Sequence, residues 1–195
     1  AGEVIERPAS AVKELVENAI DAGARQVDIT LHDGGRALIA VSDDGAGMSP
    51  DELTLAVERH ATSKLPDDDL VNIATLGFRG EALPSIAAVS RLVLETRSPE
   101  ERSGTRIEIA GGKLLRIEEA GLPSGTSIAV SDLFYNTPAR RKFLRAEATE
   151  LSDITSLVTH YALAYPEKSF ELRNQMGELI QAPAAATLRD RVFQL

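Results

Sequence analysis

The chain has 195 residues, of which 43% are hydrophobic and 26% charged, and this is the composition of an ordinary soluble globular domain with one well-buried core. It contains no cysteine, which excludes a disulfide framework and a thiolate metal site, and no apolar run is long enough to cross a bilayer. The formal net charge of −9 argues against a surface generally covered by nucleic acid, but it leaves room for a local basic patch.

The first part of the chain is predicted to form two helices around a β-hairpin. Pro8 at a first helical turn and Gly23 beyond the last turn bound a helix with one apolar stripe. Ser49 and Glu52 form a capping box that starts the second helix. The predicted elements, in chain order, are a helix at 8–21, strands at 25–31 and 37–43 joined by a turn at 33–35, and a helix at 50–58.

The rest of the chain alternates between hairpins and helices. The predicted elements are a long functional loop at 60–80, a helix at 81–89, strands at 91–97, 104–110, 113–119 and 125–131, a short basic helix after residue 136, a helix at 149–164 and a hairpin of 170–174 with 178–181. This order predicts an α+β fold with a largely antiparallel sheet and helices on one face. Three aromatic residues are expected in its core: Phe134, Tyr135 and Phe143.

One face of the first predicted helix is acidic. At 100° per residue, Glu14, Glu17, Asn18 and Asp21 gather opposite the apolar stripe, with Lys13 only at the margin. Glu17 and Asp21 are four residues apart and repel each other, and a divalent cation would relieve that repulsion. Magnesium needs only one or two protein oxygens when phosphate supplies others. The pattern alone therefore fits either a solvated polar face or a magnesium site.

Two glycine-rich segments could hold a nucleotide. Asp43 ends a predicted strand, and the following Gly45 and Gly47 allow positive φ and close approach to a flat ligand, while the carboxylate suits the exocyclic amine of adenine. Residues 77–80, Gly-Phe-Arg-Gly, lead into a helix whose free N–H groups favour phosphate. Lys64 could fold over the phosphates from the loop between them. Taken singly, these features also fit a plain turn and a solvated lysine.

In this order and at this spacing, the segments closely resemble the ATPase domain of the MutL family of DNA mismatch repair proteins. That family belongs to the GHKL superfamily, with gyrase B, Hsp90 and histidine kinases. The resemblance covers nearly the whole chain, and its most specific parts are Gly77-Phe-Arg-Gly-Glu-Ala-Leu83 and Asp132-Leu-Phe-Tyr135. It implies a Bergerat-type ATP-binding domain over 1–195, a two-layer sandwich with a mixed, mostly antiparallel sheet. Asp44 is a departure, because the family usually has Asn there.

The resemblance also implies a role for single residues. Glu14 matches the general base for the attacking water, and Asn18 matches the Mg²⁺ ligand. Asp43 matches the carboxylate that binds adenine, and Thr126 supports the same contact. The further positions that match nucleotide contacts are Ala22, Gly47, Thr62, Ser63, Lys64, Gly77, Phe78, Arg79, Gly80, Glu81, Ala82 and Leu83.

The function that the resemblance implies is Mg²⁺-dependent ATP binding and slow hydrolysis that act as a conformational switch. ATP would order the 60–80 lid and drive homodimerisation, which signals from mismatch recognition to strand incision. The implied partners are the mismatch-recognition protein MutS and a downstream nuclease or helicase, in the cytoplasm near the nucleoid and without a membrane. Because the chain begins at Ala1 and ends in an apolar stretch, we expect a piece of a longer polypeptide, without the second domain that follows in the family.

Two other interpretations stay open at this point. The first is a nucleotide-triggered DNA clamp or scaffold with incidental hydrolysis, in which DNA would bind to Arg140, Arg141, Lys142 and Arg145. The same residues also fit a solvated basic helix face. The second is a histidine kinase, which needs a phosphoacceptor histidine on a dimerisation helix. The surroundings of the three histidines do not suggest that role.

Overall fold

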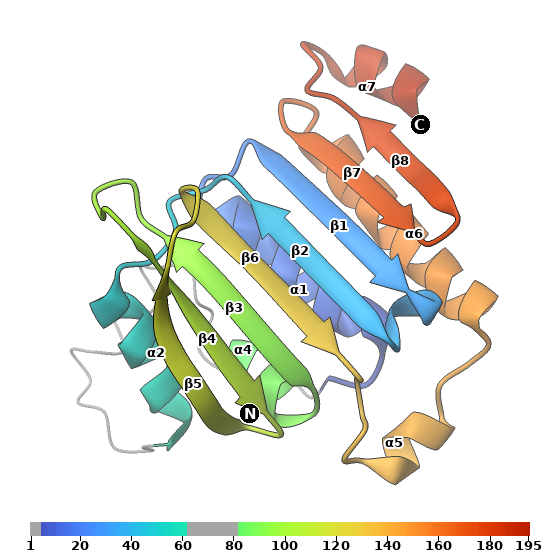
Figure 1. The fold of residues 1–195 in the computed structure, drawn as a ribbon. Coiled ribbons are helices and arrows are strands. Elements are labelled where there is room, and N and C mark those ends of the chain that lie inside the picture. Colours follow the sequence, from blue (N-terminus) through green and yellow to red (C-terminus); the bar gives the residue numbers. More distant parts are fainter. Residues whose placement is uncertain (1–4, 62–81) are drawn as a thin grey trace.

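An eight-stranded β-sheet runs through residues 5–61 and 82–195, the part of the chain that this computed structural model describes (Figure 1). Its strands are β1 (Gln26–His32), β2 (Leu38–Asp43), β3 (Arg91–Arg97), β4 (Gly104–Ala110), β5 (Lys113–Ala120), β6 (Gly125–Ser131), β7 (Ser169–Asn174) and β8 (Gly177–Ala182). Their order is β5-β4-β3-β6-β2-β1-β7-β8, and all neighbours are antiparallel except β1 and β7. The predicted mixed, mostly antiparallel sheet is confirmed.

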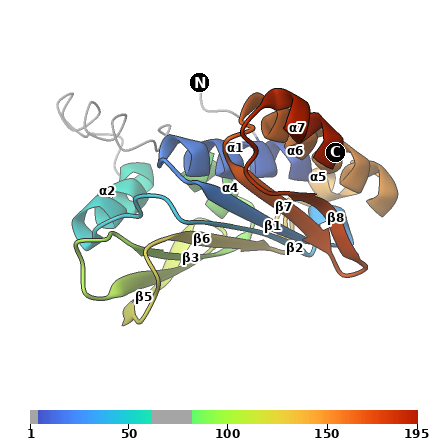
Figure 2. The ribbon, with the colours of Figure 1, turned by 90° about the horizontal axis from the view of Figure 1, so that it is seen from above.

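The helices form a second layer on one face of this sheet, as Figure 2 shows for α1, α4 and α6. The helical segments of the described residues are α1 (Pro8–Asp21), the 3-10 turn η1 (Asp33–Gly35), α2 (Pro50–Ala61), α4 (Ala82–Ala88), α5 (Pro138–Lys142), α6 (Glu147–Ala164) and α7 (Leu188–Gln194). Helix α1 packs on β2, and α6 packs beside α1 and on β7. The predicted α+β fold, with helices on one face, is confirmed as well.

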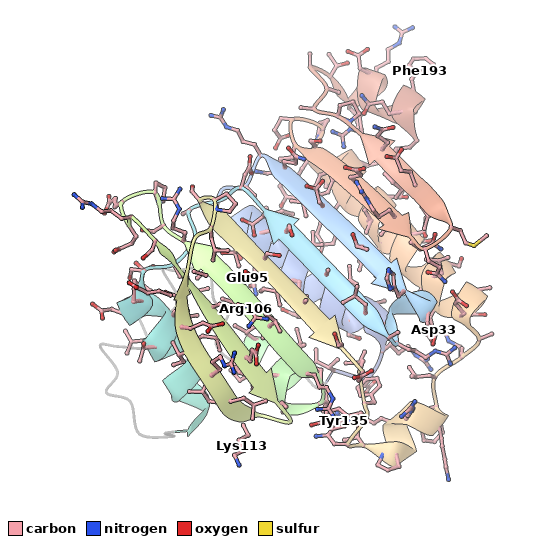
Figure 3. The ribbon with its side chains drawn as sticks, in the orientation of Figure 1. Asp33, Glu95, Arg106, Lys113, Tyr135 and Phe193 are labelled. Atoms are coloured by element: carbon pink, nitrogen blue, oxygen red, sulfur yellow. The ribbon has the colours of Figure 1, made fainter. Side chains whose placement is uncertain are left out.

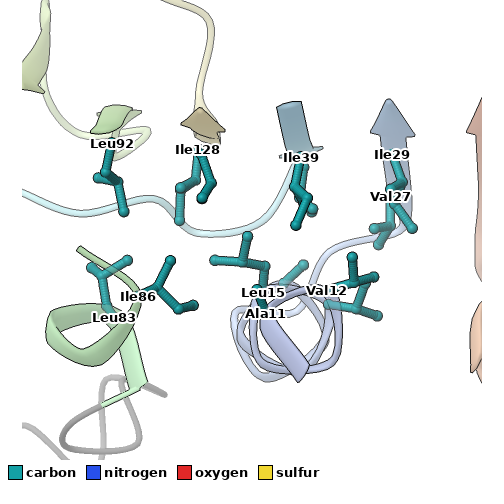
Figure 4. Close-up of a cluster of buried hydrophobic side chains, with 14 of the residues drawn as sticks. Ala11, Val12, Leu15, Val27, Ile29, Ile39, Leu83, Ile86, Leu92 and Ile128 are labelled. Atoms are coloured by element: carbon teal, nitrogen blue, oxygen red, sulfur yellow. The ribbon is translucent and has the colours of Figure 1, made fainter. Parts of the chain in front are cut away.

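The alternation of residues along the strands places the core between the two layers. In β1 every second residue, beginning with Val27, is buried, and the residues between them are more exposed. Figure 4 shows Val12 of α1 below the inward side chains of β1, and Ile86 of α4 below Leu92 and Ile128 of the neighbouring part of the sheet. The opposite face of the sheet carries polar side chains such as Glu95 and Arg106 (Figure 3). The hydrophobic core therefore lies between the helices and one face of the sheet.

Helix α6 begins two residues before the predicted start at Thr149. Thr149 N and Glu150 N both donate to the carbonyl of Ala146, the residue that precedes the helix. The buried carboxylate of Glu150 reaches back to accept from Arg145 N at 3.0 Å and from Arg7 Nη1 at 2.9 Å. The helix start is therefore set by tertiary contacts of Glu150 and not by a Thr149 cap.

The expectation for the three aromatic residues is wrong in one case. Phe134 is fully buried and Tyr135 is half-buried, but 76% of the Phe143 surface is exposed. Phe143 follows α5 directly, and none of the residues of this short helix is buried. The side chain therefore projects from a helix that itself stands at the surface.

Candidate functional site

A cavity of about 510 Å³ lies where several elements end together. Asp43 at the end of β2 pairs with Thr126 at the start of β6, and Thr126 pairs with Thr96 near the end of β3. The last turn of α1 lies at the same end, and Ala46 N donates to the carbonyl of Ala22 at 2.9 Å. The lining residues are Leu15, Asn18, Asp21, Ala22, Val41, Asp43, Ala46, Gly47, Ser49, Glu52, Ser98, Pro99, Glu100, Glu101, Thr126 and Ile128.

Asp43 supplies a partly desolvated carboxylate to this cavity. Its Oδ1 accepts from the backbone N–H of Gly45 at 2.8 Å, and the backbone N–H of Thr126 also stabilises the charged form. Burial outweighs these bonds, and together with the nearby charge of Asp44 it raises the pKa of Asp43 to about 6. At neutral pH the group is therefore mostly ionised and offers hydrogen-bond acceptors to a ligand.

Glycines at two places allow the backbone of this corner to close up. Gly47 has a φ of +65°, and a Cβ there would lie 2.1 Å from the carbonyl oxygen of Arg97. Gly125 has a φ of +122°, and a Cβ there would lie 2.2 Å from the carbonyl oxygen of Asp43. Neither position can accept a side chain without moving backbone atoms. The glycines thus bring the loop after β2 against the ends of β3 and β6.

Asp44, where the family usually has Asn, has a clear structural role. Its Oδ1 accepts from the backbone N–H of Arg25 at 2.8 Å and from that of Gln26 at 2.9 Å. These bonds hold the loop after β2 to the start of β1. An asparagine oxygen can accept the same two bonds, so the departure leaves this contact possible in either form.

The polar face of α1 is not simply solvated. Only 5% of the Glu14 surface and 9% of the Asn18 surface are exposed, and Asp21 is exposed at the mouth of the cavity. Glu17 accepts a hydrogen bond of 2.8 Å from the hydroxyl of Tyr161 in α6, which, after burial, helps to raise the pKa of that phenol. The face that the sequence left ambiguous is therefore mostly inside the molecule.

The donor set at Asn18 fits a magnesium ion. Its Oδ1 is buried and has no hydrogen-bond partner in the described part of the chain, although Asn18 lines the cavity. A buried acceptor without a partner is costly unless a ligand satisfies it. The described residues hold no cluster of three or more His, Cys, Asp or Glu arranged for a metal. One amide oxygen beside phosphate oxygens and water is a set that Mg²⁺ accepts.

The described wall of the cavity is acidic. Asp21, Asp43, Glu52, Glu100 and Glu101 line it, and no lysine or arginine does so within residues 5–61 and 82–195. Glu52 belongs to the predicted capping box, since its carboxylate accepts from Ser49 N while Ser49 Oγ accepts from Glu52 N. The glutamates of the β3–β4 loop were not among the predicted site residues. A polyanion can bind here only if cations accompany it.

The structure brings five of the predicted site residues together and separates others. Asn18, Ala22, Asp43, Gly47 and Thr126 all line the cavity. Another eight lie outside the described residues: Thr62, Ser63, Lys64, Gly77, Phe78, Arg79, Gly80 and Glu81.

Three further predicted residues belong to the described part of the chain and do not line the cavity. Glu14 is one turn before Asn18 on α1. Ala82 and Leu83 form the first turn of α4, and their side chains are buried.

The predicted DNA-binding residues lie at the other end of β6. Helix α5 follows the last residue of β6, whereas Thr126 stands near its first residue (Figure 1). Arg145 is held by Glu150 and Asp153, and Arg140 Nη1 donates to the carbonyl of Ile5 at 3.3 Å. Two of the four cations thus already have partners inside the molecule.

A search of the described residues for membrane spans finds no helix that has both the length and the apolar character to cross a bilayer.

Comparisons with known proteins agree with this geometry. Residues 5–113 match the family described as histidine kinase-, DNA gyrase B-, and HSP90-like ATPase. The chain is 62% identical over 196 residues to the DNA mismatch repair protein MutL of Koribacter versatilis and 65% identical to that of Solibacter usitatus. Each match covers all of this chain and 30% of the relative, so the chain spans about a third of the length of these relatives.

A solved structure shows the same fold. The MutL ATPase domain of Aquifex aeolicus complexed with ADP matches with a TM-score of 0.81 and 36% sequence identity. The match covers 98% of this chain and 69% of that one.

Proposed function

Because this chain belongs to the MutL family of DNA mismatch repair proteins and forms its GHKL-type ATPase domain, we propose that the cavity binds ATP with Mg²⁺ and that the domain hydrolyses it slowly. One observation supports this most strongly. Asp43, whose carboxylate is ionised at neutral pH, and Asn18, whose buried Oδ1 has no hydrogen-bond partner among the described residues, line the same cavity from the sheet and from α1 respectively. The carboxylate of Asp43 suits an amine donor, and the amide oxygen of Asn18 suits a cation.

The base of the nucleotide is proposed to lie at the sheet end of the cavity. There Asp43 would accept a hydrogen bond from the exocyclic amine, and Thr126 would support the contact. Gly47 has no side chain, so the loop after β2 can line a flat slot without filling it. Val41 and Ile128 add apolar surface to the same wall. A small number of fixed polar groups on an apolar wall is the usual make-up of such a pocket.

The phosphates are proposed to lie along α1. Mg²⁺ held by Asn18 Oδ1 would supply positive charge to phosphate oxygens in an otherwise acidic cavity. Glu14, one turn away on the same helix and shielded from solvent, would orient the attacking water and take its proton. Lys64 and the segment 77–81, which lie outside the described residues, would complete the phosphate contacts together with the start of α4.

This chain spans about a third of the length of its relatives, and the biological role considered next is that of the full-length relatives. We propose that ATP acts as a conformational switch, in which the 60–80 segment orders over the nucleotide and the protein dimerises. By the family resemblance, the switch would pass a signal from MutS to a strand-cutting nuclease or a helicase in the cytoplasm. The DNA clamp remains the alternative, and two of its four proposed cations are already engaged by protein groups.

A charge-neutral substitution of Glu14 tests the hydrolytic step. In Glu14→Gln, binding of an ATP analogue should stay within about threefold of wild type, while steady-state phosphate release should fall at least about 100-fold, in the range typical of a lost general base. Glu17→Gln is the matched control, because it removes the same charge about one turn away on the same helix, where Glu17 accepts a hydrogen bond from Tyr161. Phosphate release near the wild-type rate in Glu14→Gln would remove Glu14 from the mechanism.

A further inference from the structure

Thr96 is a buried residue beside the proposed base site. It has no part in the nucleotide contacts proposed for the cavity. Only 1% of its surface is exposed, and it does not line the cavity. Its hydroxyl oxygen makes three contacts: Met48 N at 2.9 Å, the carbonyl of Gly125 at 3.1 Å and the hydroxyl of Thr126 at 2.8 Å. It therefore joins the loop after β2, the start of β6 and one polar side chain of the cavity wall.

The number of protons fixes the direction of these bonds. A hydroxyl can donate one hydrogen bond and accept two. The backbone N–H of Met48 can only donate to Thr96, and the carbonyl of Gly125 can only accept from it. All three contacts are hydrogen bonds at once only if Thr96 gives its proton to Gly125. The hydroxyl of Thr126 must then donate to Thr96.

The direction of these hydrogen bonds determines whether the Thr126 hydroxyl donates to a ligand or accepts from it. Because its proton points into the wall toward Thr96, its remaining lone pairs are left for the cavity that it lines. The ionised carboxylate of Asp43, the strand partner of Thr126, also offers only acceptors. This end of the cavity thus presents two acceptors side by side. A carbonyl oxygen placed there would meet lone pairs, whereas an amino group would meet two partners for its hydrogens.

We propose that Thr96 is a positioning residue for base selection, because it holds Thr126 as a hydrogen-bond acceptor and so favours a purine with an amino group at position 6 over one with a carbonyl. The inference rests on the proposed nucleotide function and adds the residue that sets the polarity of the wall. Removal of the Thr96 hydroxyl frees the Thr126 proton, and Thr126 can then turn and donate to a carbonyl. The discrimination should weaken even if the fold survives.

The test compares two probes that share the phosphates and the ribose. Adenosine 5′-(β,γ-imido)triphosphate and its inosine counterpart are titrated with Mg²⁺ into the 195-residue chain, and the ratio of their dissociation constants is measured. In Thr96→Val, which keeps the β-branched shape, the preference for adenosine should fall roughly tenfold, as for the loss of one buried hydrogen bond. Thr96→Ser keeps the hydroxyl and should restore the wild-type ratio.

Thr105→Val is the matched control, because Thr105 is the partner of Thr96 on β4 and does not line the cavity. It should leave the ratio unchanged. A purely structural role for Thr96 would weaken both probes equally, so an unchanged ratio in Thr96→Val overturns the inference. If Thr96→Val does not fold, Thr126→Val is measured instead. A wild-type preference for adenosine in Thr126→Val would also overturn the inference. Failure of wild type to bind either probe would instead refute the nucleotide site itself.

Discussion

Asp43 is the residue whose charge state controls the proposed base contact. Its pKa is raised from 3.8 to about 6 by burial, so it is ionised above that pH and protonated below it. A ligand amine needs the ionised, acceptor form, and its binding would in turn lower the pKa. We expect the affinity for an ATP analogue to be constant above about pH 7 and to fall by up to about tenfold per pH unit below 6.

Calorimetric titrations between pH 5 and 8 check this dependence. The fold responds in the opposite sense: because the folded-state pKa of Asp43 is above its unfolded value, the stability from this group is fully present below about pH 3.8 and is lost as pH rises through about 6. Weaker binding near pH 5 therefore cannot be blamed on destabilisation by Asp43. An affinity that does not change across the whole range would place the base away from Asp43.

Gly47 occupies a position in the loop after β2 that excludes a side chain. Gly47→Ala combines a positive φ with a Cβ 2.1 Å from a backbone oxygen, so it should lower the free energy of unfolding by more than about 2 kcal/mol or displace the loop. Urea unfolding measures the change. Gly121→Ala is the control, because a Cβ there meets nothing within 4 Å and should have little effect. Equal stability of the two variants would contradict the close backbone approach.

At the scale of elements, α7 is anchored by one buried side chain. Arg191 is fully buried and donates to the carbonyls of Ala162, Pro166, Lys168 and Pro183. These bonds tie α7 to α6, to the residue before β7 and to the residue after β8. Burial lowers the pKa of this guanidinium, and the nearby charge of Glu167 opposes that shift.

We expect Arg191→Ala to cost roughly 3 kcal/mol, because it removes several bonds and leaves buried carbonyls without partners. Arg189→Ala, two residues earlier and exposed, should change the stability by less than about 0.5 kcal/mol. Hydrogen exchange should show the loss of protection first in α7 and β8. Equal effects of the two substitutions would mean that Arg191 does not anchor α7.

Local signals were sufficient to predict most elements of this fold. Pro8 and Gly23 bound α1 nearly as predicted, and the capping box from Ser49 to Glu52 is present in both of its bonds. Strands such as β1, β3 and β4 alternate because each buries one face under the helices, whereas β5 at the edge of the sheet has no buried residue. The start of α6 was missed because Glu150 accepts from Arg7, which lies 143 residues away in the sequence, as well as from the nearby Arg145.

The sequence predicts the cavity residues only where neighbouring residues of one segment line the cavity together. Asn18 and Asp43 were found because their neighbours in sequence share the cavity with them. The β3–β4 loop, residues 98–101, was missed because it reaches the cavity only through the pairing of β3 with β6. Thr96 was missed for the same reason. The long-range order of the strands, including the parallel pair of β1 and β7, is set by packing and leaves no local pattern in the sequence.

At the scale of the whole molecule, charge decides how an anionic nucleotide can bind. The chain has a net charge of −9, and the described lining of the cavity contains acids without a lysine or arginine. The basic residues of α5 stand at the far end of β6 and cannot compensate for this. Affinity for a triphosphate should therefore depend strongly on a divalent cation, for which Asn18 offers a buried oxygen that has no partner within residues 5–61 and 82–195.

The most direct test of the account is a calorimetric titration of a non-hydrolysable ATP analogue into this chain, with and without Mg²⁺, for wild type and Asp43→Asn. The substitution keeps the shape and one acceptor but gives the base contact an amide in place of a carboxylate. We predict binding by wild type that weakens at least about tenfold without Mg²⁺ and is lost in Asp43→Asn. Binding that is indifferent to both Mg²⁺ and Asp43 would contradict the nucleotide site proposed here.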